Sequence, residues 1–520
     1  MPKFIPYDPK QNKMVVINYA DQLQAGTFEF AINHIIDHKL DLTIFHPRYR
    51  NEEEGRPAYD PAILLKIILF AYSKGITSSR EIQWCCETNI IFKALSCDTV
   101  PHFTTLAGFV SGRSEEIEAL FEQILLICDE QGLLGKELFA LDGCKISSNA
   151  AKEWSGTFKE LEQKRDKIKR QIHHHINEHK KRDTNDARED ERGQRTQQAI
   201  ETLNKAHDKI ERFLKSASPR MGQGKRAKEV KSNITDNESA KMTTSKGTIQ
   251  GYNGIATVDK KHQVIVDAQA FGEGQEHHTL QPVLNTVRER FKRLGIETHD
   301  PIITADTGYA NEANMQYLHD NNINGYIPDN QFRRRDPKFS GQRTNHSQRK
   351  AITGKKKATT CVIPASEFNF DPVNKTCRCP SGESMRHRGE LIDRNGHRKV
   401  FFEGRLTKCR ACDLKHRCLH NPDSPNTRKG HGRQVSFILQ KGQRAPNYTD
   451  WMKQRVDSEQ GKTIYSHRMS VVEPVFGNIG TNKRLNRFSL RGKKKVQGQW
   501  QLYCLIHNIE KLKNYGQLAA

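Results

Sequence analysis

The sequence lacks any long hydrophobic run. Its longest apolar stretch, Ala62–Tyr72, is interrupted by Lys66 and is shorter than the roughly 20 residues that a membrane-spanning helix needs. The first residues, Met1–Lys13, are polar and contain no apolar segment of the kind found in secretory signals. These absences argue against a membrane protein. We expect a cytoplasmic, nucleoid-associated protein whose cysteines are reduced.

Acidic residues are too few to balance the basic ones. The 520 residues include 84 Lys and Arg against 61 Asp and Glu, which gives a formal net charge of +23. A charge of this size favours a polyanionic partner, because binding releases counterions and long-range attraction speeds the encounter. We therefore expect a nucleic-acid partner. A generally basic soluble surface is the alternative, and a membrane surface is less favoured.

Residues 1–135 are predicted to form a helical N-terminal domain. Asp60 is placed to cap a helix whose first turn holds Pro61, and apolar residues then recur at helical spacing. Ser78 and Glu81 have the spacing of a capping box for a further helix. Short helices of this kind suit DNA binding through a helix-turn-helix element, dimerisation, or plain packing.

Residues 136–330 change to an α/β pattern. Leu138–Leu141 and Pro301–Ala305 are short apolar runs that predict buried strands, and an acid follows each run directly. These acids are Asp142 and Asp306. Side chains at the carboxyl ends of strands in an α/β layer meet in a shared crevice, so we expect the two aspartates to lie close together.

Two inserted segments interrupt this pattern. Residues 157–217 are highly charged but periodic, and they predict a helical hairpin. Residues 331–460 lose regular patterning, which predicts a basic, cysteine-containing insertion with exposed loops. Patterning resumes in residues 461–520, where a helix bearing Glu473 precedes a basic stretch and a last helix, Gln499–Asn514.

Glu473 is the third acid that we group with Asp142 and Asp306. Three carboxylates in one place repel one another unless cations lie between them. Two Mg²⁺ ions separated by ~4 Å activate a water or a 3′-hydroxyl and stabilise the leaving oxygen during in-line attack on a phosphodiester. The spacing by itself is a weak signal, because an acid that follows a strand is often a turn or cap residue.

Half of the 12 cysteines fall in the predicted insertion. Cys409 and Cys412 have the spacing of zinc ligands. The candidate ligands of a structural zinc ion are Cys379, Cys409, Cys412 and Cys418. His416 and His420 are substitute ligands, and reduced thiols without metal are the alternative. No general base or open coordination position accompanies these residues, so we do not expect catalytic zinc.

Several short motifs are arranged in an order that runs along nearly the whole chain. They are Gly55-Arg56-Pro57, Leu141-Asp142-Gly143, Gly251-Tyr252-Asn253, Ala305-Asp306-Thr307-Gly308-Tyr309, Tyr465 with Arg468 and Glu473-Pro474, Phe476-Gly477, Arg487-Phe488 and Arg491-Gly492. With these motifs the sequence resembles the DDE-type transposases of bacterial insertion sequences. It resembles more narrowly the branch that has a Tyr/Arg/Glu signature around the third acid.

This resemblance implies an RNase H-like catalytic core, which is a mixed five-stranded sheet flanked by helices. It implies that Asp142, Asp306 and Glu473 are catalytic and bind two Mg²⁺ or Mn²⁺ ions. The implied activity is cleavage of the transposon ends and joining of their 3′-hydroxyls to target DNA, without a covalent enzyme intermediate. The implied partners are double-stranded DNA, as terminal inverted repeats and target, and a second copy of the chain in a synaptic homodimer.

The resemblance also implies which side chains contact DNA. Tyr465 and Arg468 are three residues apart on one helix face and are expected to contact phosphates near the cut. The expected backbone contacts from the basic stretch are Lys483, Arg484, Arg487, Arg491, Lys493, Lys494 and Lys495. A surface arginine with a half-buried tyrosine, and a solvated basic face, are the alternatives.

Two positions depart from the family's pattern. The signature usually has a Lys seven residues after the Glu, where this chain has Gly480, and Lys483 is the nearest substitute. Pro474 disfavours a helical conformation at Glu473, so we predict that the helix begins or kinks there. Two other functions stay open: an RNase H-like nuclease without strand transfer, and a non-catalytic or domesticated DNA-binding protein.

Overall fold

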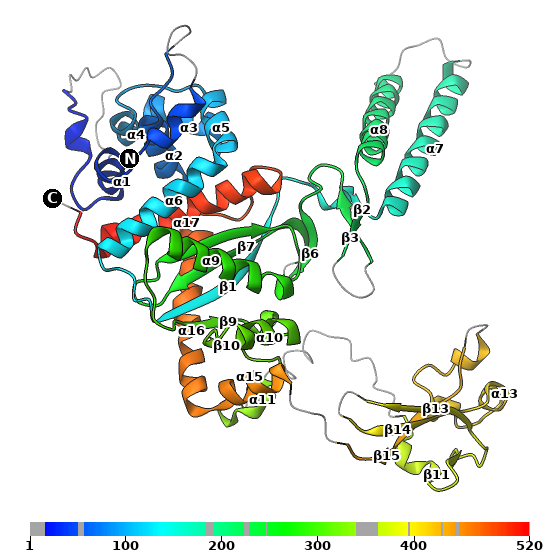
Figure 1. Ribbon diagram of the computed structural model, residues 1–520. Helices are drawn as coiled ribbons and strands as arrows, with labels where there is room; N and C mark the ends of the chain where they lie inside the picture. Colours follow the sequence, from blue (N-terminus) through cyan, green and yellow to red (C-terminus); the bar gives the residue numbers. More distant parts are fainter. Residues whose placement is uncertain are drawn as a thin grey trace, which may run out of the picture. The chain divides into compact units, whose positions relative to one another are not determined.

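The computed structural model describes residues 16–49, 57–183, 191–222, 228–245, 247–339, 362–393, 396–427, 430–442 and 447–518. The chain divides into two compact units, Met1–Asn330 with Met452–Ala520, and Gln331–Trp451 (Figure 1). Gly55 and Arg56 of the N-terminal motif lie outside the described residues. No helix within the described ranges is both long enough and apolar enough to cross a membrane.

Short helices make up the N-terminal part of the first unit. They are α1 (Phe28–His38), α2 (Pro61–Ser73), α3 (Ser79–Thr88), α4 (Ile90–Leu95), α5 (Phe103–Gly112) and α6 (Ser114–Glu130). Asp60 caps α2 by accepting a hydrogen bond from the Ala62 N–H at 2.7 Å, and Pro61 occupies its first turn. Ser78 caps α3 in the same way. The predicted starts of these two helices are confirmed.

A mixed sheet lies at the centre of the first unit. Its strands are β1 (Leu138–Ser147), β6 (Ala240–Thr244), β7 (Gly247–Asp259), β8 (Ile265–Phe271), β9 (Ile302–Ala305) and β10 (Gly325–Tyr326). β7 is antiparallel to β1 and β8, whereas β9 is parallel to β1 and β10. The predicted mixed α/β fold is confirmed. The sheet has six strands and not five, because β7 is long enough to pair with β6 along its first part and β8 along its second.

Helix α17 (Lys493–Tyr515) is buried over much of its length, and it packs against both α6 and β8. The indole N–H of Trp500 donates to the carbonyl of Ile255 in β7 at 3.0 Å. Asn508 accepts from the Ile265 N–H and donates to the Ile265 carbonyl, both at 2.8 Å. These hydrogen bonds from buried polar side chains align the helix on the sheet.

Helix α16 (Glu459–Gly477) continues through Pro474, so the helix does not begin at that residue. Proline has no N–H, and the carbonyl four residues earlier, that of Ser470, therefore loses its helical hydrogen bond. Gln263 donates its side-chain amide to the Ser470 carbonyl at 3.0 Å. This tertiary contact replaces the missing bond and allows the helix that bears Glu473 to stay intact.

Residues 157–217 contain two long helices, α7 (Phe158–Asp183) and α8 (Glu191–Ser216). They pack along each other around a small apolar core. The buried members of that core are Leu161, Ile168, Ile172, Ile200 and Ile210. Short strand pairs lie near the ends of the two helices: β2 (Ser155–Gly156) with β5 (Ser232–Asn233), and β3 (Arg220–Met221) with β4 (Glu229–Val230).

The second unit contains regular β structure where the sequence predicted exposed loops. Its strands are β11 (Asn369–Asp371), β12 (Thr376–Arg378), β13 (Arg386–Ile392), β14 (Arg398–Glu403) and β15 (Gln434–Gln440). Its helices include α11 (Phe332–Arg335), α13 (Leu406–Arg410) and α14 (Lys415–Cys418), and α15 (Tyr448–Asp457) follows at its end. Val400, Phe402 and Val435 form a core with Phe368 and Cys377. The strands are short and separated by polar turns, so their alternation is weak in the sequence.

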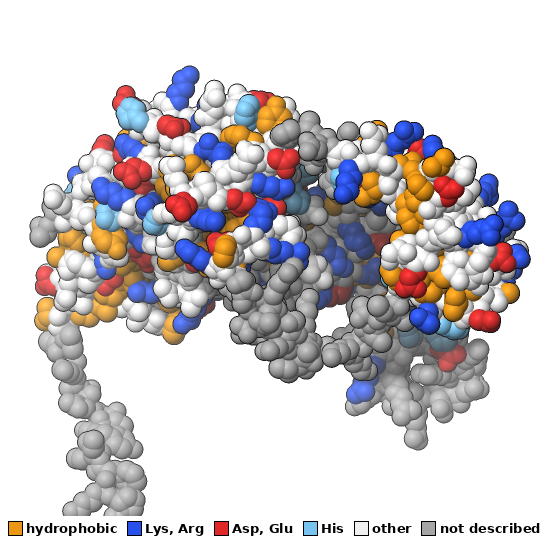
Figure 2. Space-filling view, turned by 90° about the horizontal axis from the view of Figure 1, so that it is seen from below, with side chains coloured by type: hydrophobic (Ala, Val, Ile, Leu, Met, Phe, Trp, Pro, Cys, Tyr) orange, Lys and Arg blue, Asp and Glu red, His pale blue; other side chains and the backbone are white. Residues whose placement is uncertain are grey.

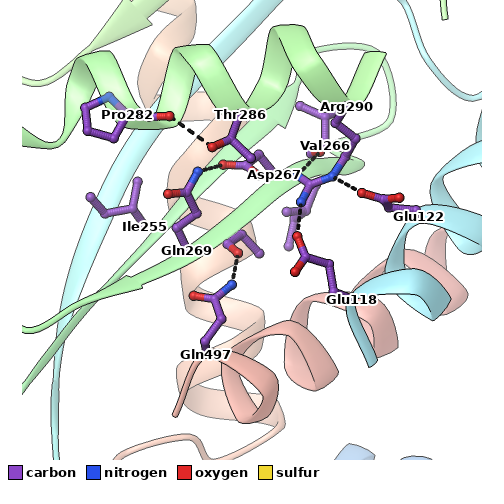
Figure 3. A network of polar contacts seen from close by, with 12 residues as sticks. Glu118, Glu122, Ile255, Val266, Asp267, Gln269, Pro282, Thr286, Arg290 and Gln497 are labelled. Carbon is purple, nitrogen blue, oxygen red and sulfur yellow. Dashed lines mark hydrogen bonds and ion pairs between the residues drawn. The ribbon is translucent and has the colours of Figure 1, made fainter. Parts of the chain in front are cut away.

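One buried arginine joins the N-terminal helices to the sheet. Arg290 of α9 (Leu280–Leu294) is 1% exposed and forms an ion pair with Asp267 of β8. It also reaches two acids of α6, Glu122 at 3.1 Å and Glu118 at 3.2 Å (Figure 3). Asp267 is equally buried, so removal of the guanidinium leaves an uncompensated charge in the protein interior.

We predict that Arg290→Ala lowers the free energy of unfolding by about 3–5 kcal/mol, because Asp267 is left buried without its partner. Urea denaturation followed by circular dichroism measures the change. The control is Arg293→Ala, which removes a more exposed arginine that shares only Glu122. Equal stability of the two variants would contradict the role assigned to Arg290.

Candidate active site

Strand pairing places Asp142 and Asp306 side by side. β1 and β9 are parallel, and Leu141 is paired with Ala305, so the residue that follows each of them is an aspartate. Neighbouring strands lie about 4.8 Å apart, which brings together two acids that are distant in the chain. Asp306 follows the end of β9 as predicted. Asp142 lies in the middle of β1, because pairing with β7 extends that strand to Ser147.

Arg468 of α16 is the main counter-charge of Asp142. It is 6% exposed, and its Nη2 lies 2.7 Å from Asp142 Oδ2. Burial raises the pKa of Asp142 to about 6; Arg468 opposes this rise, while Asp306 and Glu276 add to it. Burial lowers the pKa of Arg468, but Asp142 and the neighbouring acids outweigh that effect and raise it. The site therefore holds more than one carboxylate around a single guanidinium.

Glu473 lies on the same helix as Arg468 but is exposed to solvent. Its charge reaches Arg468 and raises the pKa of that residue, less strongly than Asp142 and Asp306 do. Glu473 thus interacts with the guanidinium of Arg468, and that guanidinium in turn pairs with Asp142. The structure brings Asp142 and Asp306 together directly and places Glu473 at the solvent side of the site.

A further acid, Glu276, interacts with the charges of both aspartates and was not predicted. It begins the short 3-10 helix η4 (Glu276–His278), which follows β8. Burial raises its pKa, as does Asp306, and Asn253 opposes the rise by donating a hydrogen bond at 3.1 Å. The sequence gives little indication that Glu276 belongs to the site. It follows a loop that contains glycines, and an acid in such a loop is usually a turn residue.

Some polar atoms around these acids are buried without a hydrogen-bond partner among the described residues. They include Oδ1 of Asn253 and Nε of Arg468. Tyr309, at the end of the Asp306 motif, is fully buried; burial raises its pKa, and Glu276 and Asp142 raise it further. Clustered carboxylate oxygens with a spare amide oxygen fit a hard divalent cation such as Mg²⁺.

The predicted DNA-contacting residues divide into buried and exposed ones. Tyr465 is half-buried, and the negative charge of its ionised hydroxyl would raise the pKa of Arg468. Lys483 is 1% exposed, and its Nζ pairs with Glu510 at 2.5 Å. The prediction that Lys483 contacts DNA is therefore corrected: its charge is used inside the protein, where it joins the turn after α16 to α17.

The remaining basic residues of this stretch are exposed; they are Arg484, Arg487, Arg491, Lys493, Lys494 and Lys495. Arg487 and Arg491 hold the side chain and the carbonyl of Asn149, at 2.8 Å and 2.6 Å, so they also position the segment after β1. Lys and Arg side chains are spread over the face seen in Figure 2. Charge alone therefore does not locate a DNA site. What distinguishes this stretch is its place in the chain soon after α16, the helix that bears Glu473.

The four predicted zinc ligands surround one cavity of about 290 Å³ in the second unit; they are Cys379, Cys409, Cys412 and Cys418. Burial raises the pKa values of Cys409 and Cys418, and the neighbouring cysteines raise them further. Every cysteine in the described part of the chain is free.

Among the described residues, neither predicted metal site has three candidate ligand atoms that all lie within 4.8 Å of one another. Across the described ranges, the group that places three ligand atoms within 4.8 Å of one another is His207, Asp208 and Glu211 on the surface of α8. The carboxylates and the thiols would therefore have to move closer together to hold an ion.

Two family models match the chain. The model described as "Transposase DDE domain" matches residues 378–513, and the one described as "Transposase domain (DUF772)" matches residues 17–112. The chain is a DDE-type transposase of the insertion-sequence kind. No curated protein and no solved structure matches this transposase. The first match contains Glu473 and the four cysteines, whereas Asp142, Glu276 and Asp306 lie outside both matches.

For this transposase, we predict that Arg468→Gln raises the pKa of Asp142 above about 6, because the variant removes the positive charge that stabilises the carboxylate. Carbon-13 NMR titration of labelled aspartate carboxyls in metal-free buffer measures this shift. Arg487→Gln, which removes an arginine bonded to Asn149, is the control and should leave the titration unchanged. An unchanged or lower pKa in Arg468→Gln would contradict the assignment of the counter-charge.

Proposed function

We propose that this transposase cleaves the ends of its element and joins the freed 3′-hydroxyls to target DNA by metal-assisted phosphoryl transfer. The observation that carries the proposal is the pairing of Leu141 with Ala305, which brings Asp142 and Asp306 together beside Arg468. Two Mg²⁺ or Mn²⁺ ions, when held by Asp142, Asp306 and Glu473, supply an activated oxygen nucleophile and stabilise the leaving oxygen.

The strand directions support an RNase H-like core, as the resemblance implies. β1, β7 and β8 form an antiparallel series, and β9 and β10 run parallel to β1 on its other side. In this arrangement β6 is an addition to the common five-stranded sheet. α16 packs on β1, β7 and β9, so it carries Arg468 and Glu473 to the strands that bear the aspartates.

Arg468 performs two tasks in this proposal. Its guanidinium neutralises Asp142 and so reduces repulsion among the acids. When cations take over that task, the guanidinium is released to bind a DNA phosphate with the bidentate geometry that arginine favours. Tyr465 lies next to it on α16 and contacts the same stretch of backbone.

The start of α17 supports DNA backbone binding by the exposed basic residues. Lys493, Lys494 and Lys495 occupy its first turn, although the positive end of a helix dipole disfavours cations there. Glu238 accepts from the Lys493 N–H at 2.8 Å, and Glu115 pairs with Lys494 at 2.5 Å. Two carboxylates thus already lie at this position, which shows that it favours anions, and a DNA phosphate is the proposed further partner of the lysines.

The remaining parts of the proposal concern assembly. The N-terminal helices bind the terminal repeats or pair protomers, and two ends are held in a homodimeric synaptic complex. A nuclease without strand transfer is separated from a transposase by supplying pre-cleaved end DNA with a target plasmid. Only a transposase yields joined products in that reaction.

We predict that Asp142→Asn and Asp306→Asn each lower end cleavage by about a thousandfold or more, as expected when one member of a group acting as a unit is removed. Binding of end DNA should be retained, because the basic residues are unchanged. Gel assays of cleavage and binding with labelled end DNA measure both properties. Asp320→Asn, an exposed aspartate on α10 (Glu312–Asp320), is the control. Cleavage at the control's rate by Asp142→Asn would contradict the proposed mechanism.

We also propose that the four cysteines of the second unit bind structural zinc. Four thiols around one cavity match the ligand set of a tetrahedral site, and their thiolates need a cation between them. Gly404 and Gly432 leave room for the sulfur of Cys409: a Cβ at Gly432 would lie 3.0 Å from it, and one at Gly404 would lie closer still. The small apolar core of this unit gives zinc a stabilising role.

We predict that the purified chain carries about one zinc ion and that Cys412→Ser lowers this content by destroying the ligand set. Mass spectrometry of metals measures the content, and the melting temperature should fall with it. Cys97→Ser, at an exposed cysteine of the first unit, is the control. Zinc absent from the wild-type protein after purification in zinc-containing medium would rule out the site.

A further inference from the structure

We infer that Glu276 is a fourth carboxylate ligand of the divalent cations in this active site, an inference that rests on the proposed function. The described interactions connect Glu276 to both aspartates, whereas they connect Glu473 to the aspartates only through Arg468. Glu276 is thus the glutamate whose charge acts directly on the pair formed by Asp142 and Asp306.

Two glycines define where the Glu276 carboxylate lies. A Cβ placed on Gly143, the residue after Asp142, would lie 3.2 Å from Glu276 Oε1. A Cβ placed on Gly308, two residues after Asp306, would lie 2.9 Å from Glu276 Oε2. Each carboxylate oxygen therefore occupies space next to one aspartate motif. A side chain at either glycine would crowd the carboxylate and displace it from this position.

Asn253 positions this carboxylate. It is fully buried on β7, at the register position opposite Lys145, and its amide donates to Glu276 Oε1 at 3.1 Å. Its other amide atom, Oδ1, is buried without a hydrogen-bond partner in the described structure, and it lies 2.9 Å from the Cβ position of Gly143. A buried acceptor without a donor is costly, and a cation or a water bound to it removes that cost.

The charges at the site favour the same conclusion. Glu276, Asp142 and Asp306 are three like charges near one another. Arg468 contacts Asp142 and, together with Lys145, also acts on Glu276, so three carboxylates are met by two positive side chains. Divalent cations favour oxygen-only ligand sets of this kind, in which carboxylates and an amide oxygen share the coordination. Glu276 is therefore placed to hold a cation from the side of the sheet opposite to the helix that bears Glu473.

The test compares Glu276→Gln with Glu273→Gln, which removes the same charge three residues earlier in the same loop. Metal binding is measured as the rise in melting temperature on titration with Mn²⁺, and end cleavage is measured in parallel. Glu276→Gln should weaken Mn²⁺ binding by about tenfold or more and reduce cleavage, whereas Glu273→Gln should match the wild type. Wild-type Mn²⁺ affinity in Glu276→Gln would overturn the inference.

A second variant keeps the test decisive if Glu276→Gln does not fold. Gly308→Ala removes no carboxylate but displaces that of Glu276, and it should weaken Mn²⁺ binding in the same way. Retention of wild-type affinity in Gly308→Ala would also overturn the inference. Asp142→Asn in the same assays separates the two proposals. If Asp142→Asn loses Mn²⁺ binding and cleavage while Glu276→Gln keeps both, the role of Glu276 is wrong and the proposed function stands.

Discussion

The active site of this transposase depends on the electrostatic balance between several carboxylates and one guanidinium. Asp142, Glu276 and Asp306 share a partly buried space, and Arg468 is the counter-charge that contacts Asp142. Like charges at this proximity destabilise the folded chain unless positive charge is placed among them. The surrounding elements hold Arg468 there through α16, and in the proposed function the same repulsion favours the binding of divalent cations.

The structure holds α16 in place by contacts that are remote in the sequence. Pro474 removes a helical hydrogen bond next to Glu473, and Gln263 replaces it by donating to Ser470. The turn after α16 is joined to α17 by the buried pair of Lys483 and Glu510. A lysine that sequence comparison assigns to DNA is thus structural in this chain, and the exposed basic residues further along are the ones available to a phosphate.

Some of the active site could be read from the sequence, and some could not. Asp142 and Asp306 follow apolar runs, so a strand pattern together with family motifs identified them. Glu276 follows a loop, where an acid has no periodic signal and reads as a turn residue. Asn253 did belong to a recognised motif, but its hydrogen bond to Glu276 depends on the packing of η4 against β7. The sequence also gives no reason for Gly143 and Gly308. In the structure, a Cβ at either position would crowd the Glu276 carboxylate.

The sequence by itself determined the alternation of helices and strands, the capped starts of α2 and α3, the basic charge, the two aspartates and the spacing of the cysteines. These features are local, because they depend on periodicity, capping and composition within short segments. Only the tertiary structure decided the sixth strand, the unbroken α16, the burial of Lys483 and the place of Glu276. Each of these results depends on contacts between distant segments, whose free energy overrides local preference and leaves no periodic trace in the chain.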